Sequence, residues 1–123
     1  MGVLIVEDDM IISLVIERMM NKLGYKVSAK ASRGEDAVQL AKKHRPDLIL
    51  MDIRLNGDID GIEAMRQIKS ETDIPVIYIT GNTDKQNRER AAETDYVAFL
   101  TKPITMNALK RSIDTSSKIK SVA

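Results

Sequence analysis

Short runs of apolar residues alternate along the chain with longer segments in which apolar positions recur every three or four residues. The short runs predict strands and the longer segments predict helices. The predicted strands cover residues 3–6, 25–31, 48–51, 75–79 and 96–100. The first and third runs contain only apolar residues, which is typical of strands that are covered on both faces.

Capping patterns locate the first three predicted helices. The apolar positions of residues 12–23 predict a helix that stops at Gly24. Ser32 and Glu35 have the spacing of a capping box, so we expect Ser32 to cap a second helix that ends before Pro46. Asp60, three residues before Glu63, predicts the cap of a third helix with Ile62, Met65 and Ile68 on one side.

The last two helical segments differ in their apolar content. Residues 83–94 contain only Ala91 and Ala92 as apolar residues, which predicts a weakly anchored and mobile helix. Residues 106–113 form an amphipathic pattern, and we expect that helix to fray into the Ser/Lys tail from about residue 117. Together, five strands alternating with five helices predict an α/β fold with right-handed crossovers and a mainly parallel sheet covered on both faces.

Composition narrows the possible chemistry. The chain has 123 residues, of which 43% are apolar and 30% charged, as expected of one compact domain. Nineteen Lys and Arg residues against eighteen Asp and Glu residues give a net charge of +1, which offers no general argument for nucleic-acid or membrane binding. Because the chain has no cysteine and one histidine, His44, thiolate sites are excluded and Ser/His triads are disfavoured. No apolar run reaches the ~20 residues of a membrane span, and the N-terminus lacks a secretory pattern, so we expect a cytoplasmic protein.

Polar residues follow four of the five predicted strands. In chain order they are Glu7, Asp8 and Asp9, then Asp52, Thr80 and Lys102. The carboxyl ends of parallel strands meet at one edge of the sheet, where ligands bind in such folds, so we expect these side chains to converge. Each also has a structural alternative, because an aspartate can cap a helix, an aspartate or threonine can form a turn, and a lysine can be solvated. Asp9 is as readily a helix cap as a site residue.

Several carboxylates at one edge repel one another unless a cation lies between them. An oxygen-only ligand set favours Mg²⁺, which suggests phosphoryl chemistry. The chain has no P-loop and no Gly-rich nucleotide motif, so a bound nucleoside triphosphate is not expected. An aspartate of the protein can itself carry a phosphoryl group as a covalent nucleophile.

The motifs VEDD after the first strand, MD after the third, IT after the fourth and FLTKP around the fifth resemble the receiver domain of two-component response regulators. The resemblance covers essentially the whole chain. It implies the flavodoxin-like receiver fold, with five helices and a five-stranded parallel sheet in the order 2-1-3-4-5. It further implies a single receiver domain over residues 1–123, of the stand-alone type, with no output domain.

The same resemblance assigns roles at the acidic edge. Asp52 matches the phosphoacceptor, and Glu7 and Asp8 match the acidic pair that holds Mg²⁺ together with Asp52. Asp8 would be a direct ligand, and Arg54 would contribute its backbone carbonyl. The acceptor loop, residues 54–61, lacks the proline common in the family and is one residue longer. The Glu93-Thr94-Asp95 segment replaces a frequent glycine pair.

Three further positions match residues that bind or sense the phosphoryl group. Thr80 matches the hydroxyl residue that turns towards the phosphoryl oxygens, and Lys102 the ammonium that pairs with them. Phe99 matches the switch aromatic, although an ordinary core aromatic is its structural alternative. The implied change then reaches a face formed by the fourth helix, fifth strand and last helix.

The implied function is a phosphoacceptor response regulator in a phosphorelay. A sensor histidine kinase or phosphotransfer protein would donate the phosphoryl group, and a downstream protein would bind the changed face. Neither nucleic-acid binding nor membrane insertion is expected, and homodimer formation on phosphorylation stays open. The protein would not be an enzyme beyond its own phosphorylation and autodephosphorylation.

Two alternatives remain at this point. A Mg²⁺-dependent phosphatase with an aspartyl nucleophile would need a general acid two residues after it, and Arg54 cannot serve as one. A receiver-like interaction module that is never phosphorylated is disfavoured because every site position carries a competent residue.

Overall fold

Five parallel strands form one sheet at the centre of the molecule, in the order β2-β1-β3-β4-β5. The computed structural model describes residues 2–81, 85–116 and 118–119. The strands are β1 (Gly2–Val6), β2 (Lys26–Ala31), β3 (Leu48–Met51), β4 (Val76–Thr80) and β5 (Ala98–Thr101). The predicted α/β class, strand number and strand order are confirmed, and strand ends differ from the prediction by at most two residues.

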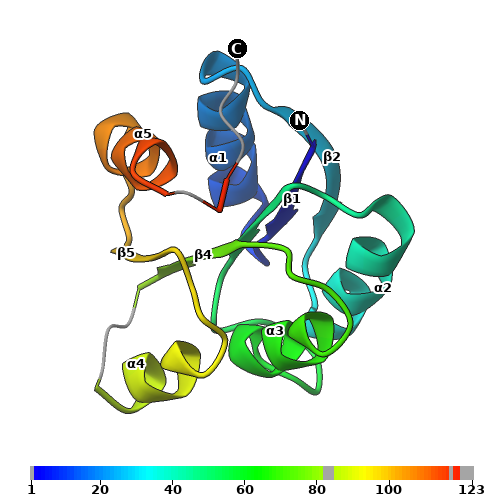
Figure 1. The fold of residues 1–123 in the computed structure, drawn as a ribbon. Coiled ribbons are helices and arrows are strands. Elements are labelled where there is room, and N and C mark those ends of the chain that lie inside the picture. Colours follow the sequence, from blue (N-terminus) through cyan, green and yellow to red (C-terminus); the bar gives the residue numbers. More distant parts are fainter. Residues whose placement is uncertain (1, 82–84, 117, 120–123) are drawn as a thin grey trace.

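The helices cover both faces of this sheet (Figure 1). They are α1 (Met10–Lys22), α2 (Gly34–His44), α3 (Gly61–Lys69), α4 (Lys85–Ala92) and α5 (Met106–Asp114). Helices α1 and α5 lie on one face, while α2, α3 and α4 lie on the other. Successive side chains of a strand point to opposite faces, so the sheet contributes to two separate apolar cores.

Burial of the central strands agrees with their sequences. Every residue of β3 and β4 is buried, and so are Val3–Val6 of β1. Tyr78 of β4 is the largest fully buried side chain and belongs to the core under α2, α3 and α4. This apolar sheet fixes where each strand ends, and therefore where the polar residues that follow it are placed.

The start of α2 corrects one prediction. Ser32 does not cap the helix: the residue at the N-cap position is Arg33, and its side chain makes no capping hydrogen bond. Glu35 does not complete a capping box either, because its carboxylate accepts hydrogen bonds from the backbone N–H groups of Asp58 and Ile59 in the acceptor loop. The helix ends before Pro46 as predicted, with Arg45 in the left-handed conformation at its C-cap.

Two other caps follow the sequence pattern. Asp9 caps α1 by accepting hydrogen bonds from the N–H groups of Ile11 and Ile12. Asp60 caps α3 by accepting one from the N–H of Glu63. The helix-cap alternative for Asp9 is therefore the correct one.

The last third of the chain holds one confirmation and one correction. Helix α4 forms within the segment 83–94, although residues 83 and 84 lie outside the described part, and Ala91 is its single buried residue. The tail does not simply fray from residue 117: Ile119 is buried against the core under α1 and α5, and Lys118 pairs with Asp95. Residues 117 and 120–123 lie outside the described residues.

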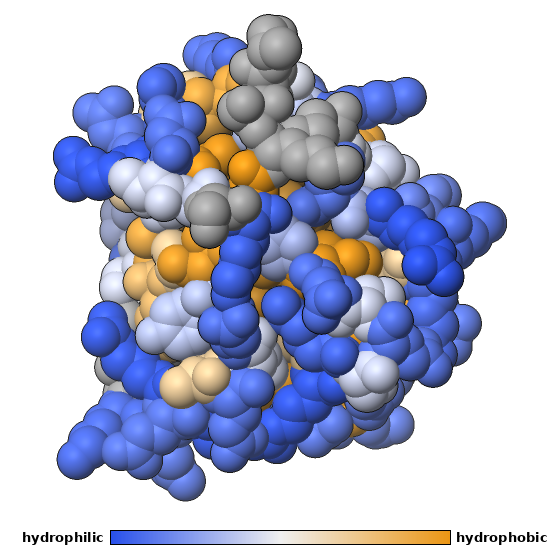
Figure 2. Space-filling view, viewed as in Figure 1, coloured by the Kyte–Doolittle hydropathy of each residue, from blue (hydrophilic) through white to orange (hydrophobic). Residues whose placement is uncertain are grey.

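Hydrophilic residues dominate the face of the molecule shown in Figure 2, with apolar residues visible in a band between the two helical layers. Across the described ranges, no helix is both long enough and apolar enough to cross a bilayer.

Candidate functional site

Backbone hydrogen bonds continue the sheet past the strand ends and set the positions of three site residues. The N–H of Glu7 donates to the carbonyl of Ala31 at 2.9 Å, and the N–H of Asp52 donates to the carbonyl of Val6 at 2.9 Å. The N–H of Lys102 donates to the carbonyl of Thr80 at 2.8 Å. These residues therefore sit on backbone that the sheet itself holds in place.

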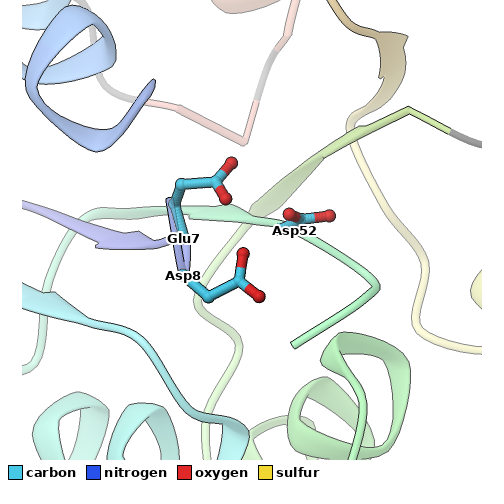
Figure 3. Close-up of side chains that lie close together, drawn as sticks. All are labelled: Glu7, Asp8 and Asp52. Carbon is cyan, nitrogen blue, oxygen red and sulfur yellow. The ribbon is translucent and has the colours of Figure 1, made fainter. Parts of the chain in front are cut away.

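Three carboxylates meet at this edge of the sheet. Glu7 and Asp8 follow β1, Asp52 follows β3, and one carboxylate oxygen from each lies within 4.8 Å of the others. Figure 3 shows the three side chains directed towards a common space. Glu7 and Asp52 are each only 4% exposed, whereas Asp8 is half-buried. The structure thus brings together the acidic residues that the sequence singled out.

Lys102 lies between two of these carboxylates. Its ammonium nitrogen is 2.7 Å from Glu7 Oε1 and 2.9 Å from Asp52 Oδ2. The contact with Asp52 has hydrogen-bond geometry. The contact with Glu7 Oε1 is an ion pair without that geometry, so this buried oxygen accepts no well-aligned hydrogen bond within the described residues. Burial lowers the pKa of Lys102, but its interactions with Glu7 and Asp52 outweigh that effect, and the pKa is raised on balance.

The charge balance of the site fits a divalent cation. Counted by formal charge, three carboxylates against one ammonium leave an excess of two negative charges, the charge that one Mg²⁺ neutralises. Partial burial and the neighbouring Glu7 raise the pKa of Asp8, as expected of an acidic cluster short of positive charge. The oxygen donors, including the buried Glu7 Oε1, which accepts no well-aligned hydrogen bond within the described residues, suit a hard cation of this kind.

The acceptor loop leaves the sheet at Asp52 and returns beside it. The N–H of Arg54 donates to Asp52 Oδ1 at 3.3 Å, and the N–H of Gly61 donates to the carbonyl of Ile53 at 2.8 Å. A Cβ atom on Gly61 would lie 2.0 Å from the carbonyl oxygen of Asp52, so only glycine allows this approach. The predicted ligand role of the Arg54 carbonyl stays a prediction.

Thr80 and Phe99 lie on the neighbouring strands. Thr80 ends β4, is 1% exposed and pairs in register with Thr101 of β5. Phe99 is half-buried on β5 and pairs in register with Tyr78. The structure thus places the hydroxyl at the acidic edge, on the strand next to β3, and the aromatic farther along β5.

Phe99 belongs to a cluster of three aromatic rings. Its ring centroid lies 5.9 Å from that of Tyr78 and 5.8 Å from that of Tyr96. The guanidinium of Arg88, on α4, lies 5.2 Å from the Phe99 centroid, which is a cation–π contact. Phe99 is therefore packed against the core and also in contact with α4. The first contact agrees with an ordinary core aromatic, and the second with a switch aromatic.

Comparison with known proteins identifies the family. The profile of the response regulator receiver domain matches residues 3–114 of the chain. The chain belongs to this family. Receiver domains of two-component response regulators interact with histidine kinases and downstream targets and bind Mg²⁺ at an acidic pocket. This chain has an acidic cluster made of Glu7, Asp8 and Asp52.

Relatives of this receiver domain have different total lengths. Over 112 residues it is 34% identical to the transcriptional regulatory protein PdtaR of Mycobacterium tuberculosis, an alignment that covers 91% of this chain and 54% of PdtaR. The chain thus spans about half the length of that relative. It is 36% identical over 118 residues to the protein PilH of Pseudomonas aeruginosa, covering 91% of this chain and 93% of PilH.

One solved relative contains a metal ion. The receiver domain of the sensor histidine kinase PA1611 from Pseudomonas aeruginosa has a magnesium ion coordinated in its active-site cleft. It is 35% identical to this chain with a TM-score of 0.79, and the match covers 89% of this chain and 91% of that one.

Sequence reasoning missed the contacts that connect the site to its surroundings. The sequence pattern predicts Glu35 as a capping residue, but its carboxylate binds the acceptor loop. Arg90 of α4 pairs with the helix cap Asp60, with nitrogen–oxygen distances of 2.8 and 3.2 Å. The sequence shows only that α4 carries two arginines, Arg88 and Arg90, on a poorly anchored helix, so it could not have specified the partner of Arg90.

Proposed function

We propose that this receiver domain accepts a phosphoryl group on Asp52 in a Mg²⁺-dependent reaction and passes the signal to a partner protein. The observation that carries the proposal is the position of Asp52, which is 4% exposed, lies next to two further carboxylates and pairs with Lys102. An aspartate that only forms a turn would not need two neighbouring carboxylates and a paired lysine.

The metal would be held by Glu7, Asp8 and Asp52, with the Arg54 carbonyl as a further oxygen ligand. Support comes from the negative charge excess and from the three carboxylate oxygens that lie within 4.8 Å of one another. When bound, Mg²⁺ neutralises charge on the transferring phosphoryl group.

The transfer step needs little chemistry from the protein. A carboxylate oxygen of Asp52 forms a bond to phosphorus while the bond between phosphorus and the donor nitrogen of a phosphohistidine breaks. The electron pair of that bond stays on the imidazole, which then takes up a proton. Lys102, now paired with Asp52 Oδ2 at 2.9 Å, would pair with a phosphoryl oxygen instead, and the Thr80 hydroxyl would donate a hydrogen bond to another. The protein is then its own catalyst rather than an enzyme acting on other substrates.

Phosphorylation would change the face formed by α4, β5 and α5. Movement of Thr80 towards the phosphoryl group frees space beside β5, and Phe99 can turn into it. A turn of Phe99 would break its contact with Arg88 and loosen α4, which supports a downstream protein target at this face. We place the donor among sensor histidine kinases and phosphotransfer proteins, which puts the reaction in the cytoplasm. A homodimer of phosphorylated chains would use the same face.

Incubation with Mg²⁺ and a small acyl-phosphate donor tests the proposal. We expect one phosphate per chain, stable in acid and labile in alkali, and no label when the metal is removed by a chelator. Asp52→Asn should abolish labelling, whereas Asp9→Asn, at the helix cap outside the cluster, should retain it.

Calorimetric titration with Mg²⁺ alone provides a second readout. The parent should bind Mg²⁺ in the absence of any donor, and Asp52→Asn should bind more weakly because one carboxylate ligand is lost. Labelling that persists in Asp52→Asn would contradict the proposed acceptor.

A further inference from the structure

The carboxylate of Glu35 lies under the tip of the acceptor loop. Glu35 is in the first turn of α2, outside the acidic cluster, yet one of its oxygens accepts hydrogen bonds from the N–H groups of Asp58 and Ile59, both at 3.1 Å. Its other oxygen pairs with Arg33 at 2.9 Å. A single side chain thus holds two consecutive backbone donors of the loop that begins at Asp52.

The loop is shaped around this carboxylate. Gly57 has φ +105°, and a Cβ atom there would lie 2.6 Å from Glu35 Oε2. A Cβ atom on Gly34 would likewise lie 2.6 Å from a side-chain carbon of Ile59. The absence of a side chain on both sides lets the loop tip approach α2 closely enough to reach Glu35.

The base of the loop is as tightly fixed as its tip. Gly61 packs against the carbonyl of Asp52, and its N–H binds the carbonyl of Ile53. Between these two anchors lies Arg54, whose N–H donates to Asp52 Oδ1. A loop held at both ends has little freedom to rotate the peptide groups next to Asp52.

Glu35 is ionised at neutral pH, which strengthens its hold on the loop. The hydrogen bond from the Ile59 N–H, with smaller contributions from Arg33 and the Asp58 N–H, keeps the pKa of Glu35 below its ordinary value of 4.5 despite partial desolvation. Hydrogen bonds to a charged acceptor are stronger than those to a neutral one.

We propose that Glu35 is a positioning residue for phosphorylation of Asp52, because its carboxylate fixes the acceptor loop and so the Arg54 backbone beside Asp52. The inference rests on the proposed function. Residues that orient metal ligands without touching the metal typically contribute about 10-fold to 100-fold to metal affinity or activity.

Three variants of the full chain test this role: Glu35→Ala, Glu35→Gln and Asp36→Ala. Asp36 is the matched control, since it lies in the same first turn of α2 but is exposed, and among the described residues its side chain forms no hydrogen bond or ion pair with the loop. We expect Glu35→Ala to weaken Mg²⁺ binding, measured by calorimetry without donor, by about tenfold, and to lower the acyl-phosphate labelling rate by a similar factor. Glu35→Gln keeps an oxygen acceptor and should recover most of both, and Asp36→Ala should match the parent.

The amide protons of Asp58 and Ile59 give a readout independent of the reaction. In metal-free protein their NMR shifts should change in acid, with a midpoint below pH 4.5, as Glu35 takes up a proton, and the change should be smaller in Glu35→Ala. If Glu35→Ala does not fold, Gly57→Ala perturbs the same contact from the loop side and should weaken Mg²⁺ binding in the same direction.

Two results would overturn the positioning role. The first is that folded Glu35→Ala binds Mg²⁺ and is labelled as well as Asp36→Ala. If Glu35→Ala does not fold, the same result in Gly57→Ala overturns the role. The other is an acid response of the loop amide shifts that is the same in the parent and in Glu35→Ala. Failure of the parent itself to label would instead contradict the proposed function, so the two failures are distinguishable.

Discussion

Helices α3 and α4 lie on the same face of the sheet but are held there in different ways. Five of the nine residues of α3 are buried, and its cap Asp60 is hydrogen-bonded to the first turn. Of the eight residues of α4, only Ala91 is buried. Burial of apolar side chains therefore fixes α3, while α4 needs other contacts to stay in place.

Polar and aromatic contacts replace burial at α4. Arg90 pairs with Asp60 at the start of α3, and Arg88 lies over the Phe99 ring. Directly after the helix, the Thr94 hydroxyl is hydrogen-bonded to that of Tyr78 at 2.8 Å. Each such contact is worth little alone, so α4 can shift at a small cost in free energy. Arg90 contacts Asp60 at the end of the acceptor loop, and Arg88 contacts Phe99, the proposed switch aromatic that phosphorylation would turn.

The largest effect is expected in α3. Ile68 is 1% exposed, and Ile68→Ala removes buried side-chain atoms from the core. Urea denaturation should show a free energy of unfolding lower by about 2–5 kcal/mol. If Ile68→Ala is as stable as the α4 contact variants described next, or more stable, burial does not hold α3 more firmly than polar contacts hold α4.

The next effect concerns the link between β4 and the end of α4. Tyr78→Phe removes the hydroxyl that binds Thr94, while Thr94 keeps its hydrogen bond to the Ala91 carbonyl, so the loss should be about 1 kcal/mol. Burial raises the pKa of Tyr78 to about 12. Spectrophotometric titration in alkali should therefore show one tyrosine that ionises last, and Tyr78→Phe should lack that step.

A smaller effect is expected at the ion pair between α4 and the α3 cap. About a third of each side chain is exposed, so Arg90→Gln should cost on the order of 0.5–1 kcal/mol at neutral pH. Burial raises the pKa of Asp60, but Arg90 and the Glu63 N–H lower it more, so the net pKa is below its ordinary value of 3.8.

This pKa gives the cost a defined pH dependence. A carboxyl with a lowered pKa stabilises the folded state above its unfolded pKa and loses that contribution as pH falls through the folded value. The stability difference between parent and Arg90→Gln should therefore shrink below pH 3.8. A difference that stays constant into acid would show that Asp60 is not the partner that matters. Lys42→Gln, at a surface pair with Glu71, controls for loss of a positive charge.

The smallest effect is expected at Arg88. Arg88→Gln removes an exposed cation–π contact worth about 0.5–1 kcal/mol at most. NMR should show altered Phe99 ring signals and little change at Ile68 of α3. Ring signals unchanged from the parent would mean that Arg88 does not hold Phe99.

The difference between α3 and α4 also explains what the sequence could predict. The apolar strands and the amphipathic α3 were predictable because their burial follows a simple period, and Asp60 because capping is local in sequence. Convergence of Glu7, Asp52 and Lys102 followed from the prediction of a parallel sheet, in which the carboxyl ends of the strands share one edge. Glu35 shows the limit: its local pattern matched a capping box, but the backbone groups it binds are more than twenty residues away.

The periodicity of a sequence does not reveal other long-range polar contacts either, because the partners are far apart along the chain. Arg90 and Asp60 are thirty residues apart, and nothing in the sequence around either residue indicates that they pair. Ile119 lies in a Ser/Lys tail whose composition predicts a solvated segment. Its burial against the core under α1 and α5 depends on a surface that forms only after folding.

One measurement tests the central claim most directly: amide hydrogen exchange of the chain before and after phosphorylation with Mg²⁺ and an acyl-phosphate donor, with Asp52→Asn treated identically. We predict one phosphate on Asp52, changed exchange in α4, unchanged exchange in the buried part of α3, and no change in Asp52→Asn. A phosphate on another residue, or stoichiometric phosphate on Asp52 with α4 exchange unaltered, would contradict the account.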